Sequence, residues 1–221
     1  MNAVIRALGV FISALAFATG PAVAGNHGQD ALDDLGAQWW QWALSIPAPI
    51  NPINDTTGAN CFVGQRGPVW FLAGSSSGKE TRRVCNVPEG TALFFPVINQ
   101  VGVSAPACDG APSTVAKLRA DAAAVIDAAT GLAVKLDNRP VRNIRRLRSD
   151  VFATTFPADN FFGAPCLGQG QVYSPSVDDG YYVMLPGLRA GTHHLSIQAA
   201  SGSFFVDVFY TLNVVKRNTR D

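Results

Sequence analysis

The stretch from Cys61 to Asn99 reads CFVGQRGPVWFLAGSSSGKETRRVCNVPEGTALFFPVIN, and it indicates the fold class. It contains short apolar runs at Val69–Ala73, Val84–Val87 and Ala92–Ile98, separated by segments rich in glycine, serine and proline. Short runs that are rich in Val, Phe and Trp and bounded by turn residues are typical of β-strands. The stretch therefore predicts the centre of a β-sheet core.

The segments between these runs predict how the strands are connected. Gly74–Lys79 is expected to close a hairpin between the first two runs, and Pro88–Gly90 to form a second tight turn. In such a hairpin Trp70 lies across from the strand that carries Cys85. We therefore expect Trp70 to be buried in the core beside a Cys61–Cys85 bridge.

The rest of the chain adds two helices and further strands. Residues 30–45 are expected to be helical because Asp30 can cap the helix, Pro47 ends it, and apolar residues recur at steps of three and four. Residues 113–129 form the second helix, and runs of strand character follow at 132–136, 151–156, 181–185, 192–199 and 204–215. These elements predict an antiparallel β-sandwich, immunoglobulin-like or jelly-roll-like, with an N-terminal helix and one inserted helix.

The N-terminus has the pattern of a secretory signal peptide. A short segment with one positive charge precedes an apolar run over Ala7–Ala18, and Ala22-Val23-Ala24 offers a cleavage site. Residues 1–24 are thus expected to be removed, leaving a single domain at 25–215 and a charged tail at 216–221. The apolar run is too short for a membrane span, and no later stretch predicts one, so we expect a secreted or periplasmic protein. An N-terminal anchor is the alternative.

Charge and cysteine content narrow the possible partners and the compartment. The formal charge of +1 becomes 0 when Arg6 is removed with the signal peptide, which argues against nucleic acid as a partner. The four cysteines are an even number in an exported chain, so disulfides are expected. Their placement favours Cys61–Cys85 and Cys108–Cys166. A zinc site is the alternative, but the cysteines lack both a CxxC pair and a nearby histidine.

Three residues are candidates for catalysis: His193, Asp178 and Asp179. A histidine beside a carboxylate can transfer protons in a hydrolase. The alternative for His193 is a structural hydrogen bond at the start of a strand. Adjacent strand residues point to opposite faces, so His193 and His194 cannot jointly bind a metal on one face.

Three other residues are candidates for ligand binding: Trp40, Arg145 and Arg146. Aromatic surfaces suit sugars and peptides, and arginine forks match carboxylate, sulfate and phosphate groups. The alternatives are core packing of the helix tryptophans and a solvated strand edge protected by charge, with Asp137 and Asp150 neutralising the arginines.

No cofactor is predicted, although a calcium ion is considered. The carboxylates and one amide that could converge on calcium, or on a glycosidase-like site, are Asp109, Asp159, Asn160, Asp178, Asp179 and Asp207. Asp178-Asp179-Gly180 lacks the alternating ligand spacing of a calcium loop. Gly74–Gly78 fits the G-x-S-x-G nucleophile pattern, but a strand is expected after it where a nucleophile elbow needs a helix.

Several motifs resemble those of a family of uncharacterised exported bacterial proteins. They are W-x-W-A-L-S-x-P at 40–47, G-Q-x-G-P-V-W-F-L-A-G at 64–74 and C-x-V-P-x-G-x-A-L-F-F-P-V-I-N at 85–99. The resemblance implies export and no particular activity. The final hairpin with its G-T-H-x-L motif is also similar to the closing strands of immunoglobulin-like modules.

Taken together, these features predict an exported β-sandwich protein with a binding or structural role, whose partner is a glycan or an envelope component. Two alternatives stay open. One is a secreted hydrolase that uses carboxylates and His193, which convergence of these groups in a cleft would favour. The other is an envelope or assembly subunit, which a long exposed apolar edge strand would favour.

Overall fold

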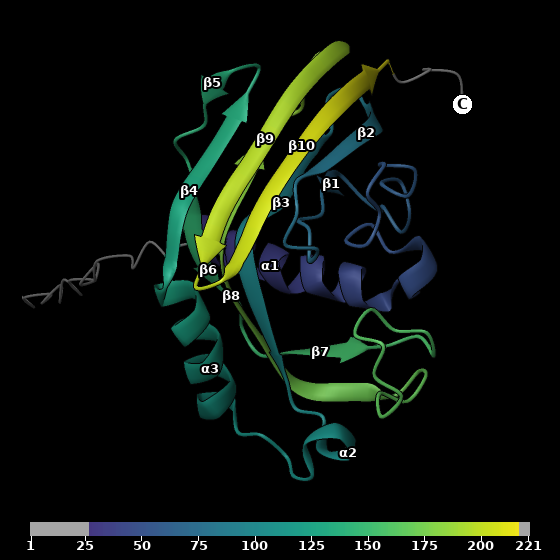
Figure 1. Cartoon of the computed structure of the whole chain (residues 1–221), viewed down its shortest axis with the longest axis vertical. Coiled ribbons are helices and arrows are strands. Elements are labelled where there is room, and N and C mark those ends of the chain that lie inside the picture. Colours follow the sequence, from purple (N-terminus) through teal and green to yellow (C-terminus); the bar gives the residue numbers. More distant parts are fainter. Residues whose placement is uncertain (1–26, 217–221) are drawn as a thin grey trace, which may run out of the picture.

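Two β-sheets face each other in a sandwich (Figure 1). The computed structural model describes residues 27–216. Sheet A has the order β1-β3-β8-β6, with β7 also paired to β8; its strands are β1 (Val69–Phe71), β3 (Ala92–Val103), β6 (Arg145–Arg148), β7 (Phe152–Thr155) and β8 (Val172–Leu185). Sheet B has the order β2-β10-β9-β4-β5; its strands are β2 (Thr81–Pro88), β4 (Ala129–Leu136), β5 (Arg139–Pro140), β9 (Gly191–Ser201) and β10 (Phe204–Val215). The predicted β-sandwich is confirmed, and each sheet contains one parallel pair, β1 with β3 and β2 with β10.

Two long helices accompany the sheets. α1 (His27–Ser45) packs on sheet A, and α3 (Val115–Asp127) packs against β8 and β3. The short helices η1 (Ala48–Ile50) and α2 (Pro106–Asp109) lie in loops. Both predicted helices are confirmed. The N-cap of α3 is Thr114, whose side chain accepts a hydrogen bond from the Lys117 N–H.

Part of the sequence-based prediction lies outside the described residues. This applies to the signal peptide at 1–24, with its cleavage site, and to 217–221 of the charged tail. Within residues 27–216 no helix is long and apolar enough to cross a membrane.

The predicted hairpin at Gly74–Lys79 is wrong. β1 pairs in parallel with β3 in sheet A, whereas β2 pairs in parallel with β10 in sheet B. The segment between β1 and β2 therefore crosses from one sheet to the other. Ser75 is buried in this crossover, where its hydroxyl oxygen accepts hydrogen bonds from Thr81 Oγ1 (3.2 Å) and Ser77 N (3.2 Å). A buried, bonded serine contradicts an exposed turn.

The apolar residues form two core layers, one on each side of sheet A. The first lies between the two sheets, and the second lies between sheet A and α1. The alternation of β1 contributes to both layers, because Trp70 packs in the first while Val69 and Phe71 pack in the second. Trp70 is half-buried beside Leu93 of β3 instead of facing Cys85 across a hairpin.

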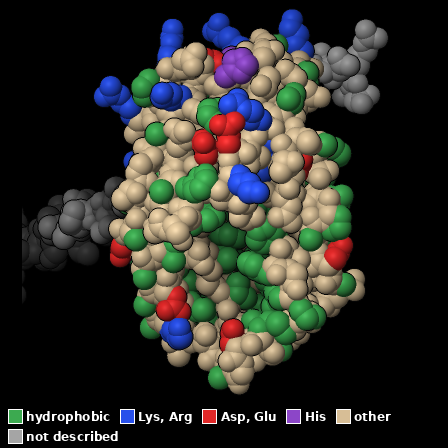
Figure 2. Space-filling view, viewed as in Figure 1, with side chains coloured by type: hydrophobic (Ala, Val, Ile, Leu, Met, Phe, Trp, Pro, Cys, Tyr) green, Lys and Arg blue, Asp and Glu red, His purple; other side chains and the backbone are tan. Residues whose placement is uncertain are grey.

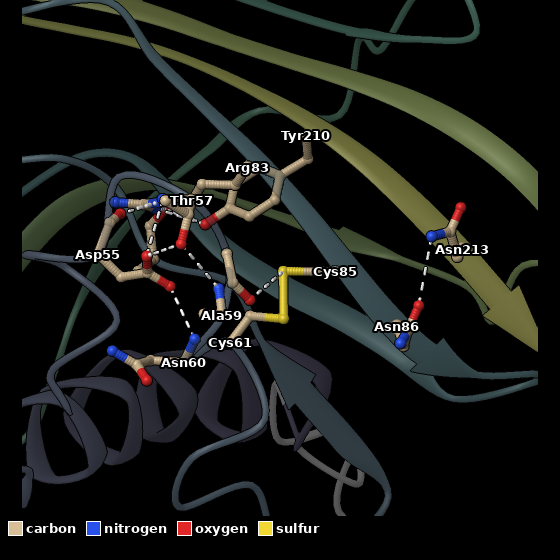
Figure 3. Close-up of a disulfide and its surroundings, with 12 residues drawn as sticks. Asp55, Thr57, Ala59, Asn60, Cys61, Arg83, Cys85, Asn86, Tyr210 and Asn213 are labelled. Carbon is tan, nitrogen blue, oxygen red and sulfur yellow. Dashed lines mark hydrogen bonds between the residues drawn. A yellow bond between two sulfur atoms is a disulfide. The ribbon is translucent and has the colours of Figure 1, made fainter.

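Both predicted disulfides, Cys61–Cys85 and Cys108–Cys166, are formed. Such bonds persist in oxidising compartments, so they indicate a location outside the cytoplasm. Figure 3 shows that Cys61–Cys85 attaches the loop before β1 to strand β2. Asp55 organises this loop by accepting hydrogen bonds from Thr57 N and Asn60 N, each at 2.8 Å. Partial burial opposes the charge, but these hydrogen bonds lower the pKa of Asp55.

Candidate binding cleft

A cleft of about 300 Å³ opens beside β3, near the point where the short strand β1 ends. Its walls belong to the two different core layers and come from elements far apart in the sequence. α1 and the loop after β7 contribute Trp39, Trp40, Phe161 and Phe162, while α3 and β10 contribute Val125, Phe204 and Val206. Figure 2 shows a hollowed face on which hydrophobic side chains gather. The cleft is therefore a long-range product of the fold.

The described lining of the cleft contains no charged side chain. Its polar side chains are two serines of the crossover, Ser75 and Ser76, and two amides of β3, Asn99 and Gln100. An apolar cavity with a few polar groups is the usual form of a site for small or peptide-like ligands. A charged ligand would lose its hydration in this cleft without finding an opposite charge.

One consecutive run of β3, from Pro96 to Val101, lines the cleft. Successive side chains of a strand point to opposite faces. A continuous run can therefore line one cavity only where the edge of the strand faces it. β1 pairs with Ala92–Phe94 alone, so the edge is open from Pro96 onward. A β-bulge between Pro96 and Ile98 lies in the same segment, and bulges often re-aim strand residues next to functional sites.

A buried hydrogen-bond chain lies under the Trp40 wall. Asp178 is 1% exposed, and its Oδ1 accepts hydrogen bonds from Trp40 Nε1 and from the Tyr182 hydroxyl, both at 2.8 Å. The Tyr182 hydroxyl in turn accepts a hydrogen bond from Asn99 Nδ2 at 2.9 Å. Burial, and then the nearby Asp178, raise the pKa of Tyr182 well above its usual value. The chain connects the cleft residues Trp40 and Asn99 through β8.

Trp40 is buried, although the apolar residues that recur at steps of three and four include Trp39 and Trp42 and not Trp40. Only 7% of its surface is exposed, because α1 is covered on more than one side. The three helix tryptophans donate to different segments: Trp39 to Leu72 O, Trp40 to Asp178 and Trp42 to Val63 O. Trp40 thus both packs and lines the cleft.

The arginine candidates lie on β6 and are not among the residues that line the cleft. Arg146 binds Asp179 through Nε and Nη2, each at 2.8 Å, and binds Asp127 through Nη1 at 2.6 Å. The hydrogen bonds with Asp179 raise the pKa of Arg146 above its already high value. Arg145 is exposed at the edge of the sheet. The neutralising acids are therefore Asp179 and Asp127 rather than the expected Asp137 and Asp150.

The structure does not bring His193 together with Asp178 or Asp179. His193 lies on β9 of sheet B, where its Nδ1 is 2.7 Å from Asp137 Oδ2 and its Nε2 is 3.1 Å from Arg189 O. Asp178 and Asp179 lie on β8 of sheet A, each held by the partners already described. The three catalytic candidates therefore do not form one constellation, and their proposed role stays a prediction.

The carboxylates considered for calcium are also dispersed. Asp109 ends α2, Asp159 lies in the loop after β7, and Asp207 lies on β10. Across residues 27–216 no three His, Cys, Asp or Glu side chains lie close enough together to hold a metal ion.

Comparisons with known proteins return no match: no family model, no curated protein and no solved structure corresponds to this chain. The resemblance of its motifs to exported bacterial proteins stays a prediction.

Sequence reasoning missed most of the cleft. Trp40 is a candidate from the sequence, whereas no local pattern marks Phe161, Phe162 or Phe204 as ligand-binding residues. One local signal was present, since Pro96 interrupts an apolar strand. Proline cannot donate to a ladder and is confined to edges and bulges. Pro96 thus marks the open edge of β3.

Proposed function

We propose that this protein is an exported, disulfide-bonded binding protein whose uncharged ligand occupies the cleft beside β3. The observation that carries the proposal is the cleft itself: about 300 Å³, apolar walls from separate elements, and a described lining without charge. Its volume is at the lower end of the range typical of small-molecule sites.

Exposure of aromatic side chains favours this cleft over a surface platform for glycans. All four tryptophans and all four tyrosines fall within the described residues, and every one of them is buried or half-buried. A flat aromatic strip for sugar stacking is therefore missing from the part of the chain that is described. Among residues 27–216 the exposed Phe, Tyr or Trp residues are all phenylalanines, and two of them, Phe162 and Phe204, line the cleft.

The test uses N-phenyl-1-naphthylamine, an uncharged dye that fluoresces in apolar surroundings. We expect the protein to bind the dye and Phe162→Asp to weaken binding about tenfold, because a carboxylate at the cleft disfavours an apolar occupant. Phe162 is 49% exposed, so the substitution should not impair folding.

Phe62→Asp is the matched control, since Phe62 is 65% exposed and does not line the cleft. The two variants introduce the same charge at exposed phenylalanines. Equal dye binding by both variants, or no binding by the unmodified protein, would contradict the proposed function.

A further inference from the structure

The open edge of β3 narrows the class of ligand. From Pro96 to Val101 this edge has no strand partner within the described part of the chain and lies in a cleft with apolar walls. Exposed edges attract further strands, and proteins commonly block them. An unpaired stretch of strand edge that lines an apolar cleft therefore points to a ligand that can pair with it.

At three other strands, side chains or loops form hydrogen bonds with backbone groups, as a neighbouring strand would. At β1, the Gln65 side chain donates to Phe71 O at 2.8 Å and accepts from Phe71 N at 2.9 Å. At β2, Val84 N donates to Thr57 O at 2.8 Å. At β7, Gln41 Nε2 donates to Ala153 O at 2.9 Å.

The hydrogen-bond pattern shows which groups of β3 face the cleft. Phe94 O accepts from Leu72 N at 3.0 Å, so the backbone of Phe94 points away from β8. Beyond the bulge, Ser104 N donates to Pro175 O on β8 at 2.9 Å, so the backbone groups of Ser104 point toward β8. In an antiparallel pair the backbone groups of successive residues point alternately toward and away from the neighbouring strand. The backbone groups of Asn99 and Val101 consequently point away from β8, toward the cleft.

These backbone groups need hydrogen-bond partners in apolar surroundings. Gln100 Nε2 donates to Val101 O at 3.2 Å and so meets part of that need. No strand among residues 27–216 pairs with this side of β3 beyond Phe94. Pro96 fits the same geometry, since it has no N–H to present.

We infer that the cleft binds an extended peptide segment of a partner protein, which pairs with β3 along Pro96–Val101 as an added strand. This inference rests on the proposed function and specifies its ligand. Main-chain hydrogen bonds hold the peptide on β3, and its successive side chains pack in turn against the two apolar walls. The uncharged, apolar lining selects a segment without charged side chains.

The probe is the pentapeptide acetyl-Thr-Val-Thr-Val-Thr-amide, about 17 Å long when extended. Two N-methylated versions test the pairing directly. One carries N-methyl groups on both valines, and the other carries them on the central and last threonines. Only one of these sets of N–H groups can face β3, so one version should bind about tenfold more weakly and the other about as well as the parent.

Two neighbouring phenylalanines provide a matched pair of protein variants. Phe204 and Phe205 are 39% and 40% exposed, but only Phe204 lines the cleft. Phe204→Ser should weaken peptide binding about tenfold, and Phe205→Ser should leave it unchanged. Hydrogen exchange at the Asn99 and Val101 amides should slow when the peptide is present.

The outcomes separate this inference from the proposed function. If the dye binds but the peptide does not, or if both N-methylated peptides bind as well as the parent, the peptide inference fails and the binding cleft stands. If neither the dye nor the peptide binds, both fail. If sedimentation shows a dimer that Phe204→Ser dissociates, the occupant is a second copy of this chain and the partner-peptide inference is overturned.

Discussion

Arg83 shows how a single buried residue joins segments that are distant in sequence. It is 2% exposed, and its guanidinium donates to the carbonyl oxygens of Asp55, Ala73, Gly74 and Ile53 and to the Tyr210 hydroxyl. Figure 3 shows it between Tyr210 and the loop that carries Asp55. Because a buried arginine requires hydrogen bonds for its donors, it fixes this loop and the crossover after β1 together.

The hydrogen-bonded pair of His193 and Asp137 makes the stability of the protein depend on pH. The hydrogen bond between them raises the pKa of His193 above 6.5 and lowers the pKa of Asp137 below 3.8. The histidine contribution is present below about pH 6.5 and is lost as pH rises through its raised pKa. The aspartate contribution is present above about pH 4 and is lost as pH falls through its lowered pKa.

Asp137→Asn should therefore destabilise the protein most between about pH 4 and pH 6.5, where both side chains are charged. Asparagine tolerates the left-handed backbone at this position (φ 49°) and keeps an acceptor for the His194 N–H. Because Asp137 is 44% exposed, solvent screens the pair and the expected loss is about 0.5 kcal/mol near pH 5.5. The loss should be smaller near pH 9, where His193 is neutral, and the free energy of unfolding in urea measures it at both pH values. A loss of equal size at both pH values would show that the charge of the pair is unimportant.

At the scale of elements, α1 approaches β8 closely because Gly36 has no side chain. A Cβ at this position would overlap Asp178 Oδ2, and Asp178 is held by Trp40 and Tyr182. Helix propensity alone favours alanine over glycine by about 1 kcal/mol. For Gly36→Ala, the close approach therefore predicts a loss of stability, whereas helix propensity predicts a gain.

We expect Gly36→Ala to lower the free energy of unfolding by about 1–3 kcal/mol, because the helix or the buried carboxylate must shift. Gln38→Ala is the control on the exposed face of α1 and should change stability by less than about 0.5 kcal/mol. Urea unfolding of both variants measures the difference. A Gly36→Ala variant more stable than the parent would mean that α1 is not packed tightly on β8.

The sequence predicted the helices and strands better than it predicted which strands pair with each other. The hairpin of β9 and β10 is local, and its alternation and its turn at Gly202 identify it. The pairing of β2 with β10 places Cys85 opposite Leu212, and no local sequence pattern predicts a contact between residues so far apart in the chain. Gly74–Lys79 has turn residues that serve a crossover as well as a hairpin, which is why the hairpin prediction failed.

The same limit applies to the cleft, because its walls meet only in the folded molecule. Trp40 could be nominated from its helix, and Pro96 carries a signal for an edge or a bulge. Phe162 and Phe204 have no local signal that distinguishes them from Phe62 or Phe205. Their role follows from the packing of β10 and of the loop after β7 beside β3.

At the scale of the whole molecule, the Cys108–Cys166 disulfide connects the loop containing α2 to the loop that carries Phe161 and Phe162. The same loop contributes one wall of the cleft. This disulfide restricts the conformations of the unfolded chain and, in the folded protein, also restrains one wall of the binding cleft. Stability and ligand binding should change together when it is removed.

The double substitution Cys108→Ser and Cys166→Ser should lower the free energy of unfolding by about 4 kcal/mol. This is the chain-entropy contribution expected for cysteines 58 residues apart, and it is a large fraction of the stability of a typical domain. Binding of N-phenyl-1-naphthylamine should weaken as well, because Phe161 and Phe162 lose their restraint. Urea unfolding and dye titration under native conditions measure the two effects. A fully folded variant that binds the dye as well as the parent would show that the wall is held by packing alone, through contacts such as that of Phe162 with Phe156.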